Sequence, residues 1–98
     1  MKEYIEQHLD LPLVLADLAA QAGLSEFHFA RMFKYDTGLA PHQFVMRARL
    51  QQAEQLLCHS QLPLTQIALE CGFSSASHFS NRFKVAYGCS PTQRRQGR

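Results

Sequence analysis

The sequence has no tryptophan, no Cys-x-x-Cys pair and no long apolar run. A membrane-spanning helix needs about 18 or more consecutive apolar residues, so no such helix is expected. The N-terminus alternates charged and apolar residues and lacks the apolar core of a signal peptide. Cys58, Cys71 and Cys89 are odd in number and irregularly spaced, which argues against a disulfide framework. We therefore expect a cytoplasmic protein with reduced thiols.

Motifs for catalysis are missing too. The chain has neither a glycine-rich phosphate loop nor a nucleophile motif with its partners. His59 and His78 are not spaced from the cysteines as zinc ligands are. These absences predict that the protein is not an enzyme and that it uses no metal and no other cofactor.

Charge is modest in amount but uneven along the chain. Charged residues make up 18% of the 98 residues, and the net charge is +2. Residues 1–36 hold three basic and six acidic residues, a net charge of −3. Residues 37–98 hold seven basic and two acidic residues, a net charge of +5. The basic part hints at a polyanionic partner, although a charged face is most often only solvated.

The strongest feature is an internal repeat between residues 15–41 and residues 64–91. The offset is 49 up to Ser25 and 50 after one inserted residue. Apolar, glycine and proline positions match together, which chance does not readily produce. The matched pairs are Leu15/Leu64, Leu18/Ile67, Ala19/Ala68, Gly23/Gly72, His28/His78, Phe29/Phe79, Phe33/Phe83, Lys34/Lys84, Gly38/Gly88 and Pro41/Pro91.

Each copy of the repeat predicts a helix, a tight turn and a second helix. Gly23 and Gly72 are expected to end the first helices with positive φ. Ser25 in the first copy, and Ser74 or Ser75 in the second, are candidate N-caps of the next helix. An alanine four residues before the glycine is the small contact residue of a helix-turn-helix. Two copies at a fixed offset make this prediction strong.

The segment between the copies predicts a long helix. Met46, Leu50, Ala53 and Leu57 form an apolar stripe at helical spacing within residues 41–59. Such a helix is about 28 Å long, while one turn of DNA is about 34 Å. We expect an N-terminal helix-turn-helix subdomain (1–40), a linker helix (41–59) and a C-terminal helix-turn-helix subdomain (60–98). The linker is then long enough to set two recognition helices roughly one DNA turn apart.

Taken together, these residues resemble the DNA-binding domain of the AraC/XylS family of bacterial transcription regulators. The matching segments are LADLAAQAGLSEFHFARMFK, TGLAPHQF, RLQQAEQLL and IALECGFSSASHFSNRFKVAYGCSP, which cover nearly the whole chain. The resemblance implies an all-α fold of about seven helices and sequence-specific binding to promoter DNA, usually with activation. It also implies RNA polymerase as a partner and use at the nucleoid.

The resemblance further implies recognition helices at about 25–36 and 75–87. The expected base-reading residues are Phe27, Ala30, Arg31, Ala76, Ser77, His78, Ser80 and Asn81. The expected phosphate contacts are Ser25, Lys34, Arg49, Ser75, Arg82, Lys84, Arg94 and Arg95. Three positions depart from the family pattern: Asn81 stands where arginine is common, His78 where tyrosine is frequent, and Arg94 where an aromatic residue often occurs.

Several of these residues have a structural alternative. Arg31 can donate two hydrogen bonds to guanine, or it can pair with Glu26 or Asp36. Asn81 can bind adenine, or its amide can simply be solvated. Phe27 fits a thymine methyl group and the protein core about equally well. The other helical phenylalanines, Phe29, Phe33, Phe73, Phe79 and Phe83, are expected to be core.

One other function class remains open on the residues alone. A helical module of this kind can bind protein instead of DNA, and the acidic first helix with Glu3, Glu6 and Asp10 suits a protein-facing surface. Family members also often carry an effector-binding or dimerisation domain before this one. The chain is therefore either a stand-alone regulator or the C-terminal part of a longer one.

Overall fold

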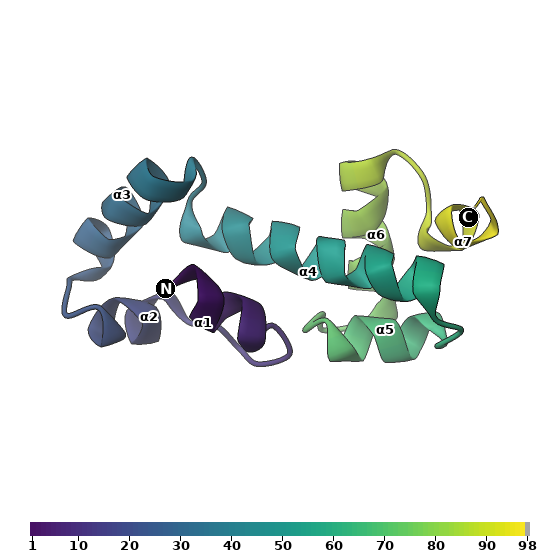
Figure 1. Cartoon of the computed structure of the whole chain (residues 1–98), viewed down its shortest axis with the longest axis horizontal. Helices are drawn as coiled ribbons and strands as arrows, with labels where there is room; N and C mark the ends of the chain where they lie inside the picture. Colours follow the sequence, from purple (N-terminus) through teal and green to yellow (C-terminus); the bar gives the residue numbers. More distant parts are fainter. Residues whose placement is uncertain (98) are drawn as a thin grey trace. The chain divides into compact units, whose positions relative to one another are not determined.

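The computed structural model describes residues 1–97, and its regular secondary structure in that range is entirely helical (Figure 1). The helices are α1 (Lys2–Gln7), α2 (Leu15–Gln21), α3 (Glu26–Thr37), α4 (Pro41–His59), α5 (Leu64–Glu70), α6 (Ala76–Tyr87) and α7 (Pro91–Gln96). The predicted all-α class, with two helix-turn-helix units and a long linker helix, is confirmed. Over residues 1–97, no helix combines the length and the apolar character needed to cross a membrane.

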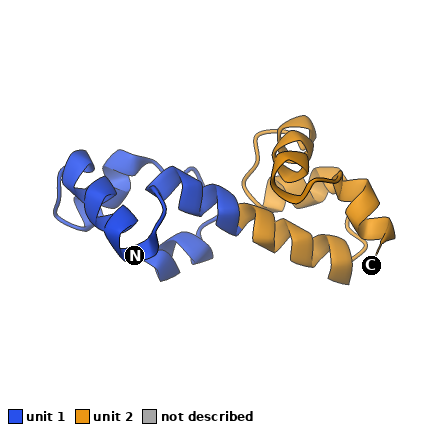
Figure 2. Cartoon of the chain, turned by 90° about the horizontal axis from the view of Figure 1, so that it is seen from above, with its two compact units in different colours: residues 1–48 blue, residues 49–98 orange. Residues whose placement is uncertain are grey.

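The chain divides into two compact units whose boundary lies inside α4 (Figure 2). Unit 1 comprises residues 1–48, and unit 2 begins at Arg49. The first half of the linker helix therefore packs with the N-terminal helices, and the second half packs with the C-terminal ones. Each half of α4 completes the core of its own unit, and it is not a separate spacer between them.

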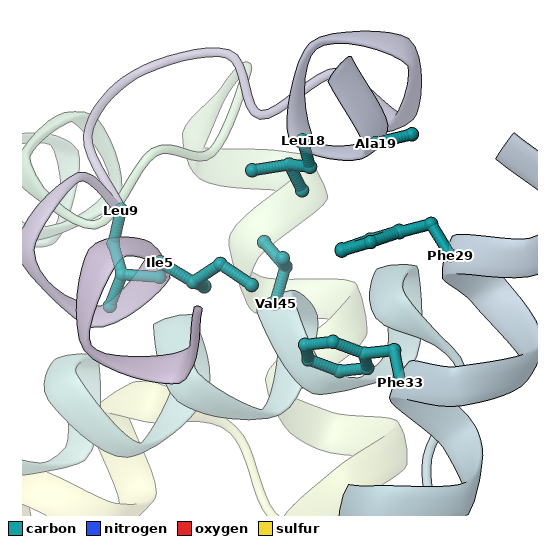
Figure 3. Packing of buried hydrophobic residues seen from close by; sticks show 7 residues of the cluster. All are labelled: Ile5, Leu9, Leu18, Ala19, Phe29, Phe33 and Val45. Atoms are coloured by element: carbon teal, nitrogen blue, oxygen red, sulfur yellow. The ribbon is translucent and has the colours of Figure 1, made fainter. Parts of the chain in front are cut away.

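The core of unit 1 forms where helices α1 to α4 meet. Its buried residues are Ile5, Leu9, Leu18, Ala19, Phe29, Phe33 and Val45. Figure 3 shows the side chains of Leu18, Phe29, Phe33 and Val45 pointing toward one another from α2, α3 and α4. Phe44 of α4 adds an edge contact to Phe33, with 5.2 Å between the ring centroids. Fully burying a side chain of this size contributes about 1.5–3 kcal/mol, so each of these residues adds appreciably to the stability of unit 1.

The core of unit 2 uses the equivalent positions of the repeat. Buried residues of α5, α6 and the turn between them are Ile67, Ala68, Cys71, Phe73, Phe79 and Phe83. Leu50, Ala53 and Leu57 of α4 are buried as well. Phe79 has ring centroids at 5.1 Å from Phe73 and 5.7 Å from Phe83. All five phenylalanines predicted to be core are buried.

Helix ends fall where the turn residues predicted them. Gly38 and Gly88 end α3 and α6 with φ of 80° and 76°, a left-handed conformation that favours glycine. Ser25 and Ser75 are the N-caps, so Ser75 and not Ser74 begins α6. Positive φ is also found at Gly23 and Gly72. Pro41 and Pro91 are the first residues of α4 and α7, where the missing N–H costs nothing.

The first helix is shorter than the acidic pattern suggested. α1 ends at Gln7, and Asp10 lies in the turn that follows. After the helix ends, the His8 ring stacks on Tyr4, with 4.2 Å between centroids, and Leu9 is buried in the core. Glu3 and Glu6 remain exposed on α1.

Candidate nucleic-acid interface

The exposed face of α3 carries an aromatic ring and a guanidinium one helical turn apart. Phe27 is 65% exposed, so it is not part of the core, although it neighbours the buried Phe29 in sequence. The guanidinium carbon of Arg31 lies 5.5 Å from the centroid of the Phe27 ring. Arg31 therefore packs on Phe27. Its guanidinium lies on the exposed side of the helix, and Ala30 beside it is half-buried.

The first turn of α3 is fixed by Ser25. Its hydroxyl oxygen accepts a hydrogen bond of 3.2 Å from the backbone N–H of His28. The same oxygen lies 2.9 Å from Nδ1 of the His28 ring. The cap satisfies one free N–H at this helix end and keeps Phe27 in a regular helical position. Both Ser25 and His28 are exposed.

The matching turn of α6 has the same cap but smaller side chains. The Ser75 hydroxyl accepts a hydrogen bond of 3.0 Å from the backbone N–H of His78. The His78 ring makes an edge contact with Phe73, with an interplanar angle of 71° and 5.6 Å between centroids. Its Nδ1 is 3.4 Å from the Ser74 hydroxyl. Among the predicted base readers of α6, Ser77 and Asn81 are exposed, whereas Ala76, His78 and Ser80 are half-buried.

The two recognition helices differ in net charge. Arg82 and Lys84 are exposed on this helix, which carries no carboxylate. On α3, Arg31 and Lys34 are matched by Glu26 and Asp36, so that helix has no net charge. Lys34 and Lys84 occupy the last turns of their helices, where a cation suits the helix dipole. Both lysines are exposed and available to phosphate.

Arg49 is less available than the sequence suggested. It lies half-buried on α4, and this burial lowers the pKa of its guanidinium. The same arginine interacts electrostatically with Cys71, and burial together with the nearby Glu70 charge raises the pKa of that thiol to about 11. Arg49 is therefore less accessible to a phosphate than the exposed Arg82 and Lys84 are.

The two arginines of α7 also have partners inside unit 2. Nη2 of Arg94 lies 2.6 Å from Oε2 of Glu54, and its guanidinium carbon is 5.8 Å from the Tyr87 ring centroid. Nε of Arg95 donates a hydrogen bond of 3.2 Å to the backbone carbonyl of Leu57. These contacts explain how α7 packs where the family often has an aromatic residue. The phosphate contacts predicted for Arg94 and Arg95 would have to compete with these partners inside unit 2.

Two exposed residues of α3 were missed by the sequence reasoning. Tyr35 is 91% exposed and Met32 is 55% exposed. With His28, Arg31 and Asp36 they line a shallow hollow of about 300 Å³ on the outer side of the helix. Helical spacing in the sequence does indicate this position for Tyr35, because it lies four residues after Arg31 and off the stripe of buried phenylalanines.

The arrangement suits binding to a nucleic-acid duplex. An α-helix fits the major groove, where arginine donates to guanine O6 and N7, and apolar groups contact the thymine methyl. Arg31 and Phe27 are the groups with this chemistry on α3. The capped helix N-termini and the exposed lysines suit contact with phosphates on either side of a groove.

Comparisons with known proteins agree on one family. A helix-turn-helix domain family model matches residues 18–97. The crystal structure of the DNA-binding domain of AdpA, a global transcriptional factor in complex with a target DNA, has a TM-score of 0.93 at 33% identity, covering 97% of this chain and 86% of that one. The AraC-type regulator from Chromobacterium violaceum has a TM-score of 0.88 at 33% identity, covering 96% and 84%.

Among curated proteins, the probable transcriptional regulator LumQ of Photobacterium leiognathi is 48% identical over 90 residues, which are 92% of this chain and 36% of LumQ. The transcriptional activator RhaS of Klebsiella pneumoniae is 39% identical over 95 residues, which are 97% of this chain and 34% of RhaS. The chain thus spans about a third of the length of these relatives. It belongs to the AraC/XylS family of DNA-binding transcription regulators.

Proposed function

We propose that this chain recognises specific promoter sites in bacterial duplex DNA through α3 and α6, and that it activates transcription together with RNA polymerase. The observation that carries the proposal is the exposed Phe27–Arg31 pair on a helix whose first turn is capped by Ser25. Phe27 is 65% exposed and lies beside the Arg31 guanidinium, so α3 presents an apolar ring and a cation together on its surface. These are groups that can contact a thymine methyl and a guanine edge in the major groove.

In this proposal the two recognition helices contribute differently. On α3, Arg31 donates to a guanine while Phe27 packs on a neighbouring thymine methyl or sugar. On α6, Asn81 reads an adenine edge, and Ser77, Ser80 and His78 contact bases or the backbone. Lys34, Arg82 and Lys84 neutralise phosphates on the groove walls. The two helices then occupy successive major-groove segments about one DNA turn apart.

Activation is supported by relatives such as RhaS, which is named a transcriptional activator. The site of action is then the bacterial cytoplasm, at promoters within the nucleoid. Contact with RNA polymerase is the step that converts promoter binding into activation. It is tested by run-off transcription with purified polymerase, in which added protein should increase transcript from a template that carries the selected site.

DNA binding is tested by equilibrium titration of fluorescent duplexes over a range of salt concentrations. If about six phosphates are neutralised, log K falls against log [salt] with a slope of about −5. Arg31→Ala should cost about 1–3 kcal/mol on the preferred duplex and relax preference at one base pair. Lys84→Ala should weaken all duplexes alike. Duplex binding that neither variant alters would refute the proposed readout.

A protein-binding module is the second candidate, favoured by the exposed carboxylates of Glu3 and Glu6. It predicts no measurable duplex binding even at low salt, together with retained binding to a polymerase subunit. The same titrations therefore separate the two functions, because electrostatic binding to DNA is strongest at low salt.

A further inference from the structure

Three side chains from three helices of unit 2 meet at the end of the second recognition helix. Glu54 comes from α4, Tyr87 is the last residue of α6, and Arg94 comes from α7. The Arg94 guanidinium is paired with the Glu54 carboxylate at 2.6 Å and lies over the Tyr87 ring at 5.8 Å. The Glu54 side chain is only 23% exposed and that of Arg94 45%. The pair is thus only partly exposed to water, which screens it less than it would a pair of fully exposed side chains.

The Tyr87 ring connects this pair to the core. Its centroid lies 4.4 Å from that of Phe83, and Phe83 is fully buried. The ring is therefore in contact with the core residue Phe83 as well as with the guanidinium. Lys84 belongs to the same last turn of α6. The Arg94 guanidinium therefore helps to orient the last turn of α6, which carries this lysine.

In the first copy of the repeat, an apolar contact stands at the place of the Glu54–Arg94–Tyr87 cluster. Phe44 holds the place of Arg94 in the first copy, and its ring packs edge-on against Phe33. The surrounding turn is built alike in both copies. Oε1 of Gln43 accepts from the Ala40 N–H at 3.0 Å, and Oε1 of Gln93 accepts from the Ser90 N–H at 2.8 Å. The local backbone is thus shared, and an ion pair in unit 2 stands where an aromatic pair stands in unit 1.

We propose that Arg94 is a positioning residue for DNA binding by α6, and that it acts through Glu54 and Tyr87 without contacting phosphate. The proposal rests on the DNA binding proposed above. The Arg94 guanidinium is paired with a carboxylate and lies over a ring, so its charge is already offset and it attracts a phosphate less than an unpaired cation does. Phosphate contacts near α6 are then made by the basic residues of that helix itself, Arg82 and Lys84.

The test compares Arg94→Gln, Glu54→Gln, the double variant Glu54→Gln/Arg94→Gln and the charge swap Glu54→Arg/Arg94→Glu. The readout is the ratio of affinities for the selected duplex and an unrelated duplex, with the salt slope of each variant. Each single variant should lower the ratio about threefold to fivefold, and the double variant no further, because both remove one interaction. The swap should restore the ratio to within about twofold of the wild type.

The matched control is Arg82→Gln, which removes an exposed cation of α6. Its salt slope should become shallower by about 0.9, whereas the slope of Arg94→Gln should stay that of the wild type. Thermal unfolding of every variant separates loss of folding from loss of positioning. Site selection adds a further readout: Arg94→Gln should relax only the bases read by α6 and leave those read by α3 unchanged.

Two results together would identify Arg94 as a phosphate contact and overturn the proposal. One is a shallower salt slope in Arg94→Gln, and the other is an affinity ratio that Glu54→Gln leaves unchanged or raises. Single variants that bind like the wild type in every assay would overturn it as well. Wild-type protein that binds no duplex at all would instead refute the proposed function, so the two failures are distinguishable.

Discussion

The guanidinium carbon of Arg31 lies 5.5 Å from the centroid of the Phe27 ring, one turn earlier on the exposed face of α3. The ring restricts the orientations of the guanidinium before any partner binds, which lowers the entropy lost on binding. Phe27→Ala should therefore lower affinity for the preferred duplex about threefold to tenfold and weaken preference at the base that Arg31 reads. Fluorescence titration against single-base variants of the duplex measures both.

A suitable control for this prediction is Leu69→Ala. Leu69 is 66% exposed on α5, which matches the exposure of Phe27 away from the predicted base-reading residues. Its replacement should leave DNA affinity unchanged. Equal losses in both variants would show that general surface apolarity matters and that the Phe27–Arg31 pair does not.

The N-cap of α6 gives a stability prediction. The Ser75 hydroxyl accepts the His78 backbone N–H at 3.0 Å, and Ser75→Ala leaves that group without its cap. The free energy of unfolding should fall by about 1 kcal/mol in urea denaturation. Ser74→Ala removes only the longer contact to the His78 ring at 3.4 Å and should cost less. The reverse order would identify Ser74 as the effective cap.

Position 88 requires glycine because of its backbone conformation and not because neighbouring atoms leave no space for a side chain. Its φ is 76°, and a Cβ built on it would meet no atom within 4 Å. Gly88→Ala should therefore destabilise the protein by about 1–2 kcal/mol through left-handed strain alone. Gly97→Ala is the control, because φ there is −84° and the new Cβ would make only ordinary contacts. Equal thermal unfolding midpoints for the two variants would contradict this account.

Cys71 predicts a loss of stability at alkaline pH. Burial, and then the Glu70 charge, raises the pKa of its thiol from 9.0 to about 11. The unfolded chain therefore loses this proton at lower pH than the folded protein. The stabilisation is fully present below about pH 9 and is lost as the pH rises through 11, at up to about 1.4 kcal/mol per pH unit.

Urea denaturation at several values between pH 8 and pH 11 measures this effect. In Cys71→Ala the decline attributable to the thiol should disappear, so its curve against pH should be flatter than that of the wild type. Cys58→Ala, which changes a half-buried cysteine of α4, should keep the wild-type decline. Parallel curves for the wild type and Cys71→Ala would show that the titration of this thiol does not govern alkaline stability.

Most of the fold was predictable from local patterns. Pro41 and the apolar stripe predicted residues 41–59 as one helix, and α4 has these bounds. The phenylalanine pairs at a spacing of four predicted the buried faces of α3 and α6, because helical periodicity determines which residues share a face. The glycines with positive φ marked the helix ends for the same local reason.

The features that were not predicted depend on contacts between distant segments. Phe27 fitted core and surface equally well, because neither its position in the first turn of α3 nor its residue type decides burial. The partner of Arg94 is Glu54, which lies on another helix and has no motif that connects the two. The division of α4 between two units likewise follows from packing on each half, which helical periodicity alone does not reveal.

Selection of bound sites from a random duplex library shows whether both recognition helices read bases. If both helices read bases, the selected sites should share two preferred sequence blocks about one DNA turn apart. Arg31→Ala should relax one block, and Asn81→Ala should relax the other. The opposite result is a single sequence block that Arg31→Ala abolishes, while Asn81→Ala selects the same sites as the wild type. It would show that α6 does not read bases.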